Sequence, residues 1–125
     1  MEGKVLILLA ERDPYSAELT EHFLRTEGYE VEVVFSAEEA LDAAIERTPD
    51  LAIVDLLISG VRGQRLCSQL LERTETAVVA ISSLASAETA FAVGASAFLQ
   101  KPIEPLQLVS TVQQLLERGA SPGTE

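Results

Sequence analysis

Apolar residues follow two patterns along this chain: short continuous runs, and longer segments in which they recur every three or four positions. Continuous runs are typical of strands buried on both faces of a parallel sheet, and the wider spacing is typical of helices with one buried face. The runs predict four strands, at 5–10, 51–55, 77–81 and 97–100, and the alternation of acidic and apolar residues at 30–35 predicts a fifth, edge-like strand. The spaced segments predict five helices, at 15–26, 36–47, 64–72, 87–93 and 105–118.

Residues that favour helix ends and turns separate these segments. Ser36 and Glu39 have the spacing of a capping box at a helix start. Gly28 and Gly94 follow two predicted helices, where a C-cap is expected. The glycines within 59–63 predict a loop. Strand and helix therefore alternate five times, which predicts an α/β domain with a parallel sheet covered by helices on both faces.

Length, composition and charge narrow the class of protein. The 125 residues suit one domain, which we expect to span 1–118, with 119–125 as a flexible tail or the start of a linker. No apolar run approaches the ~20 residues of a membrane span, so no membrane partner is expected. The net charge of −11 argues against direct binding to nucleic acid. Because the N-terminus lacks a secretion signal, a cytoplasmic location is expected.

Polar side chains stand at the carboxyl ends of the predicted strands, with Asp55 closing the strand at 51–55. Glu11 follows the first strand, Ser82 the fourth and Lys101 the fifth. The carboxyl ends of parallel strands lie along one edge of a sheet, where open α/β folds place their chemistry. A carboxylate beside a hydroxyl and an ammonium is suited to accept and hold a phosphoryl group. The simpler interpretation is that Asp55 only caps a turn.

The order and spacing of these residues resemble the receiver domain of two-component response regulators, from Lys4 to about Arg118. The segments that carry the resemblance are Glu11 with Asp13-Pro14, Pro49-Asp50-Leu51, Asp55-Leu56, Gly60, Gly63, Ser82, Gly94-Ala95 and Phe98-Leu99-Gln100-Lys101-Pro102. The resemblance implies a flavodoxin-like, three-layer α/β/α sandwich, with a five-stranded parallel sheet in the order 2-1-3-4-5 and five helices.

The resemblance also implies roles for individual residues. Asp55 matches the aspartate that accepts the phosphoryl group, and Lys101 matches the lysine that pairs with the carboxylate or the phosphate. Ser82 matches the hydroxyl residue that binds a phosphoryl oxygen on activation. Phe98 matches the aromatic residue that rotates inward when Ser82 moves. Pro102 matches a proline whose peptide bond is often cis.

Mg²⁺ is the cofactor that the resemblance implies, with Glu11, Asp55 and the backbone carbonyl of Leu57 as protein ligands. The chain departs from the family here, because Arg12 replaces the second of two consecutive acids. A guanidinium offers Mg²⁺ no oxygen and repels it, but it can pair with Glu11 or Asp55. The alternatives are that Arg12 turns to solvent while Mg²⁺ binds weakly, or that Asp13 replaces the missing acid. We hypothesise that Asp55 keeps its chemistry while metal-dependent phosphorylation is impaired.

Other departures lie around the predicted site. Ser59 and Arg62 stand in the loop beside Asp55, where the family often has proline and an acid. The interval from Ser82 to Lys101 is about one helical turn shorter than the family's usual spacing. The fourth helix or the loop before it is therefore expected to be short, which puts the family's usual dimer mode in doubt.

Three functions remain open from the sequence. The first is a receiver that takes a phosphoryl group on Asp55 from a histidine kinase or phosphotransfer protein, and relays the change to a downstream effector protein or domain. The second is a pseudo-receiver that binds partners independently of phosphorylation, which Arg12 favours. The third, a flavodoxin-type enzyme or nucleotide binder, lacks a glycine-rich loop after the first strand. A receiver modifies only itself, so we expect no enzyme activity toward an external substrate.

Overall fold

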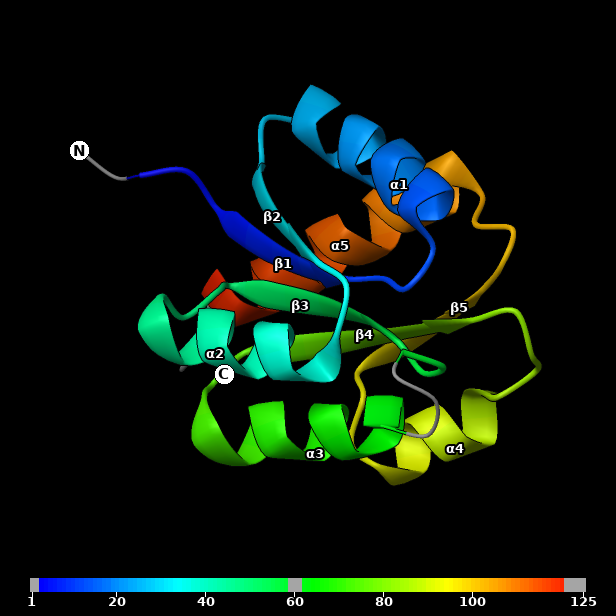
Figure 1. Cartoon of the computed structure of the whole chain (residues 1–125). Helices are drawn as coiled ribbons and strands as arrows, with labels where there is room; N and C mark the ends of the chain where they lie inside the picture. The colour runs from blue at the N-terminus through cyan, green and yellow to red at the C-terminus, as the bar shows by residue number, and fades with distance from the viewer. Residues whose placement is uncertain (1–2, 59–61, 121–125) are drawn as a thin grey trace.

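Five parallel strands form one sheet in the computed structural model, which describes residues 3–58 and 62–120 (Figure 1). In chain order the strands are β1 (Leu6–Ala10), β2 (Glu30–Val34), β3 (Leu51–Asp55), β4 (Ala77–Ser82) and β5 (Ala97–Gln100). Their order in the sheet is β2-β1-β3-β4-β5. The predicted sheet and its strand order are confirmed, and each strand end lies within one residue of its predicted position.

Helices cover both faces of this sheet. They are α1 (Pro14–Thr26), α2 (Ala37–Glu46), α3 (Arg62–Arg73), α4 (Ala87–Ala92) and α5 (Pro105–Ala120). Figure 1 shows α1 and α5 on one face and α2, α3 and α4 on the other, and a cluster of buried apolar side chains lies under each layer. The predicted three-layer α/β/α sandwich is therefore confirmed. Within 3–58 and 62–120, no helix is both long and apolar enough to cross a membrane.

The burial of each strand follows its sequence pattern. Every residue of β1 and β3 is buried, because helices pack on both faces of the central strands. At the sheet edge, β2 alternates acidic and apolar residues, and Val31 and Val34 are its buried positions. The carboxyl ends of the central strands therefore lie in a buried environment. A charged group there has little hydration and needs a partner of opposite charge.

Helix ends show the predicted signals. The Ser36 side chain accepts a hydrogen bond of 3.1 Å from the Glu39 N–H, and the Glu39 carboxylate accepts one from the Phe35 N–H. Gly28 and Gly94 have φ values of 95° and 99°. Residues with a Cβ atom rarely adopt that conformation, so glycine suits both turns. These turns end α1 and α4 and direct the chain into the strands that follow.

The predicted loop at 59–63 is wrong at its end, because α3 begins at Arg62 and includes Gly63. Glycine at position 63 is explained by close packing and not by a loop conformation. A Cβ atom at this position would lie 2.4 Å from the backbone of Leu56. Only a residue without a side chain allows the first turn of α3 to approach the end of β3 this closely.

The last helix runs further than predicted. It continues to Ala120, whereas the sequence predicted an end at Arg118. A glycine near a helix end costs only about 1 kcal/mol relative to alanine, so Gly119 does not stop the helix. The domain boundary at 118 and the tail at 119–125 stay predictions. Residues 121–125 lie outside the described part of the chain, as do Ser59 and Gly60.

The fourth helix is short, as the spacing between Ser82 and Lys101 predicts. It spans six residues, which is fewer than two helical turns. Ala90 is its one buried residue, and Phe91 is exposed. The helix is therefore held against the sheet through a small side chain.

Candidate functional site

The register of the sheet brings Glu11 and Asp55 together. Ala10 of β1 pairs with Val54 of β3, so the next residue of each strand, Glu11 and Asp55, lies at the same level. Both side chains are buried at the carboxyl edge of the sheet, with exposed fractions of 0% and 1%. Two neighbouring buried carboxylates repel each other and lose hydration, so their ionised forms need a cation nearby.

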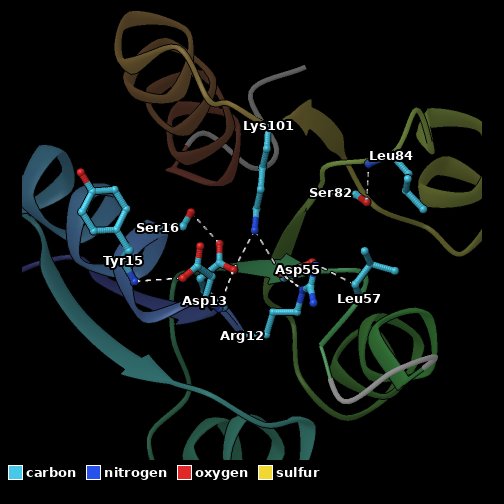
Figure 2. A network of polar contacts seen from close by, with 10 residues as sticks. Arg12, Asp13, Tyr15, Ser16, Asp55, Leu57, Ser82, Leu84 and Lys101 are labelled. Atoms are coloured by element: carbon cyan, nitrogen blue, oxygen red, sulfur yellow. Dashed lines mark hydrogen bonds and ion pairs between the residues drawn. The ribbon is translucent and has the colours of Figure 1, made fainter.

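Lys101 supplies that cation from the end of β5. Its backbone N–H donates to the Ser82 carbonyl at 2.8 Å, which fixes the residue beside the end of β4. Its Nζ donates to Glu11 Oε2 at 2.7 Å and to Asp55 Oδ2 at 3.1 Å (Figure 2). The peptide bond between Lys101 and Pro102 is cis, which confirms the expectation from the resemblance. One largely buried ammonium thus bridges two buried carboxylates.

Glu11 is held from α1 as well. Ser16 Oγ donates to Glu11 Oε1 at 3.0 Å, and the Asp13 N–H donates to Glu11 Oε2 at 3.1 Å. Both carboxylate oxygens therefore have partners besides solvent. Sequence reasoning did not single out Ser16. The signal available was a hydroxyl residue in the first turn of the helix that follows Glu11.

The two buried carboxyls have opposite pKa shifts. Burial, followed by the neighbouring Asp55 carboxyl, raises the pKa of Glu11 above its ordinary value. Burial also opposes ionisation of Asp55, but Glu11, the Leu57 N–H and the Lys101 ammonium together outweigh it. They hold the pKa of Asp55 below its ordinary value. Asp55 is therefore the member of the pair that ionises first, as a nucleophile requires.

Arg12 lies at the mouth of the site, with its side chain 51% exposed. Its Nε is 3.5 Å from Asp55 Oδ2, the oxygen that Lys101 also contacts (Figure 2). Among the described residues, no ion pair joins Arg12 to Glu11. Of the alternatives that the sequence left open, the structure shows pairing with Asp55.

Asp13 does not take the place of the family's second acid, which Arg12 replaces in this chain. Its carboxylate accepts a hydrogen bond of 3.1 Å from the Tyr15 N–H and caps the start of α1 (Figure 2). The side chain lies on the surface, whereas Glu11 and Asp55 are buried. The structure therefore does not support Asp13 as the replacement acid.

The donor set does not fit the Mg²⁺ site that the resemblance implies. Mg²⁺ requires oxygen ligands in near-octahedral geometry. Glu11 and Asp55 offer carboxylates, but Arg12 adds a cation, paired with Asp55, where the family has a second acid. Leu57 follows in a turn in which its N–H donates to Asp55 Oδ1 at 2.9 Å. Within the described ranges, no group of three His, Cys, Asp or Glu side chains could hold a metal ion.

Ser82 ends β4 next to Glu11 and Asp55, which together form the acidic pair of the site. Asp55 pairs with Ile81 in the sheet, so Ser82 lies one residue beyond that level. The side chain is buried, and its Oγ accepts a hydrogen bond of 3.1 Å from the Leu84 N–H (Figure 2). In the described part of the chain, no hydrogen bond joins Ser82 to Asp55. The hydroxyl is thus close to the site but engaged with its own loop.

Phe98 lies on β5, further from the acidic pair. It pairs with Ala80 of β4 and packs, half-buried, against the apolar cluster beneath α2, α3 and α4. It also lines a cavity of about 410 Å³, together with Ala85, Ala87, Glu88, Gln100 and Gln107. The ring therefore lies between the apolar cluster and this cavity.

Comparison with known proteins agrees with this geometry. Residues 7–113 match the family model of the response regulator receiver domain. The chain is 33% identical to the DNA-binding response regulator MtrA of Mycolicibacterium smegmatis, over 90% of this chain and 50% of MtrA. It is 29% identical to the regulatory protein VanR of Enterococcus faecium, over 94% of this chain and 52% of VanR. A CheY-like response regulator receiver domain protein from Methanospirillum hungatei superposes with a TM-score of 0.87 at 28% identity, over 97% of this chain and 100% of that chain.

The extent of these matches limits what they mean. The chain spans about half the length of the curated relatives it matches, whereas the solved structure is covered in full. The likeness therefore concerns one domain that this chain shares with longer proteins. The DNA binding in MtrA's name describes that whole protein.

Proposed function

The chain belongs to the receiver domain family of two-component response regulators, and we propose that Asp55 is the residue that accepts the phosphoryl group. The observation that carries this proposal is the buried cluster at the carboxyl edge of the sheet. There the Asp55 carboxylate is held by the Lys101 ammonium at 3.1 Å and by the Leu57 N–H at 2.9 Å. A fixed carboxylate that ionises readily is a competent nucleophile toward phosphorus.

The proposed step is a direct transfer. An Asp55 carboxylate oxygen attacks the phosphorus of a phosphohistidine on a partner. The new O–P bond forms as the P–N bond breaks, and the electron pair of the broken bond remains on the imidazole nitrogen. Lys101 then donates a charge-assisted hydrogen bond to a phosphoryl oxygen. The family uses Mg²⁺ at this site, but the donor set of this chain does not fit it, so no step is assigned to a metal.

A relay through Ser82 and Phe98 completes the proposed switch. The Ser82 hydroxyl exchanges its bond with the Leu84 N–H for one with a phosphoryl oxygen on Asp55. Because Ser82 pairs with Gln100 of β5, this movement reaches the strand that carries Phe98. The ring then turns into the adjoining cavity. A downstream effector protein or domain senses the altered face.

The phosphoryl donor is proposed to dock over α1. An apolar cavity of about 370 Å³ lies between α1 and the segment after β5, and Ser16 and Lys101 belong both to its lining and to the acidic site. Tyr15 and Leu19 stand on its rim, exposed by 77% and 51%. An apolar surface continuous with the acceptor fits a helical partner that carries the phosphohistidine. A histidine kinase or phosphotransfer protein supplies such a surface.

Two further expectations from the sequence belong to this proposal. The chain modifies itself and has no external substrate. It works in the cytoplasm, where the kinase becomes phosphorylated. The comparisons give the pseudo-receiver no support over the receiver. The departure at Arg12 is therefore interpreted as a change in how the site works, and not as a loss of its function.

The test is phosphorylation by a small acyl phosphate, followed by intact mass measurement. The protein is incubated with acetyl phosphate and Mg²⁺, and Asp55→Asn and Asp13→Asn are treated in parallel. Asn still caps α1, so the Asp13 variant is matched in fold and in charge change. We expect the mass of one phosphoryl group on the wild type and on Asp13→Asn, and none on Asp55→Asn. Equal labelling of all three proteins, or of none, would overturn the proposal.

A further inference from the structure

Arg12 and Lys101 place two cations on a single oxygen of the acceptor. Arg12 Nε lies 3.5 Å from Asp55 Oδ2, and Lys101 Nζ lies 3.1 Å from the same atom. We propose that the Arg12 guanidinium performs within the chain the charge-neutralising task of a divalent cation, so that Asp55 binds a phosphoryl-type anion without Mg²⁺. The inference rests on the proposed role of Asp55 as acceptor.

The charge count of the site supports this inference. Glu11 and Asp55 contribute two buried carboxylates, and Lys101 and Arg12 contribute two cations paired with them. The cluster is thus balanced by its own side chains when both carboxyls are ionised. A divalent cation would meet no uncompensated charge here, and Arg12 would repel it.

The geometry of Arg12 suits an incoming phosphoryl group. A guanidinium presents several N–H donors in a planar fork, which matches two oxygens of a phosphoryl group. Arg12 precedes the cap of α1 and its side chain is half-exposed, so it reaches the site from the solvent side, where a donor must approach. In the described part of the chain, Asp55 is its one ion-pair partner. The guanidinium can therefore shift from the carboxylate to the phosphoryl oxygens without leaving another acid unpaired.

The test uses beryllofluoride, a stable mimic of a phosphoryl group on aspartate, and detects the bound fluorides by ¹⁹F NMR. Each protein is titrated twice, in Mg²⁺ and in buffer stripped of divalent metal over a chelating resin. Arg12→Gln removes the charge at similar size, and Arg12→Asp restores an acid. Arg65→Gln removes an exposed arginine on α3 and is the matched control. Amide spectra establish that every variant is folded.

We expect the wild type and Arg65→Gln to show bound ¹⁹F signals at the same beryllofluoride concentrations with and without Mg²⁺. Arg12→Gln should bind about tenfold more weakly in metal-free buffer, which corresponds to about 1.4 kcal/mol. Arg12→Asp should bind only with Mg²⁺. A wild-type signal that requires Mg²⁺, or undiminished metal-free binding by Arg12→Gln, would overturn the inference and leave Asp55 as the acceptor. Absence of signal from all variants under both conditions would overturn the acceptor role as well.

Discussion

At the scale of single residues, two cations, Lys101 and Arg12, stabilise the two buried carboxylates of the site. Lys101 bridges Glu11 and Asp55, and its side chain is only 16% exposed. Arg12 contacts one of the two acids from the surface. Removing the buried bridge leaves carboxylates that repel each other without hydration to compensate.

Lys101→Ala should therefore lower the free energy of unfolding by about 3 kcal/mol at neutral pH, the lower end of the cost of breaking a buried pair. Urea denaturation measures this loss, with Lys4→Ala as the control because Lys4 lies on the surface. The loss should shrink at low pH, where protonation of one carboxyl relieves the repulsion. A loss equal to that of the control would contradict the bridging role.

The opposite pKa shifts of Glu11 and Asp55 give a pH dependence with two limbs. The pKa of Glu11 is raised above 4.5 by burial and by Asp55. The contribution of Glu11 to the free energy of unfolding is therefore complete below pH 4.5 and is lost as pH rises through the folded-state pKa. The pKa of Asp55 is lowered below 3.8, because its polar partners outweigh burial. Its contribution is present above pH 3.8 and is lost as pH falls. Carboxyl ¹³C titration should show separate midpoints in the folded protein, each returning to its ordinary value in urea; coincident midpoints would refute the assignment.

The identity of the site residues could be predicted from the sequence because strand ends in a parallel sheet share an edge. Asp55, Glu11 and Lys101 meet as expected: the strand register aligns Glu11 with Asp55, and the Lys101 side chain bridges the two carboxylates. The conformations of the side chains, and therefore their individual partners, could not be predicted. The bond from the Leu84 N–H to Ser82, and the preference of Arg12 for Asp55, depend on local packing that no sequence pattern records.

At the scale of elements, all ten predicted helices and strands exist, because continuous apolar runs and helical spacing are both strong signals in this chain. Several helix ends differ by one residue from their predicted positions, and the two differences of two residues fall on glycines. Gly63 indicated a loop but belongs to α3, and Gly119 indicated a helix end but lies within α5. Glycine marks either a turn or a close approach, and only the tertiary contact distinguishes the two.

Gly63→Ala tests the close approach of α3 to the end of β3. In an ordinary helix interior this change stabilises by up to about 1 kcal/mol. Here the added Cβ would lie 2.4 Å from the Leu56 backbone, so the free energy of unfolding should fall by about 1–3 kcal/mol. Gly3→Ala is the control, because nothing lies within 4 Å of its added Cβ. A Gly63→Ala protein as stable as the wild type, by urea denaturation, would show that α3 can move away freely.

At the scale of the whole molecule, the proposed relay runs from one edge of the sheet to one face of the sandwich. Asp55 lies at the acidic edge, Ser82 at the neighbouring strand end, and Phe98 beside a cavity on the face covered by α4. The short α4 buries one of its residues, Ala90, against the sheet. We expect that occupation of Asp55 by a phosphoryl group changes this face.

Amide NMR spectra of the wild type and Asp55→Asn, recorded before and after saturation with beryllofluoride, would follow this change residue by residue. We expect saturable shifts at Asp55 that extend through Ser82 and Leu84 to Phe98 in the wild type, and none of them in Asp55→Asn. Shifts confined to the Asp55 turn would contradict the relay. Shifts that persist in Asp55→Asn would contradict the assignment of the acceptor itself.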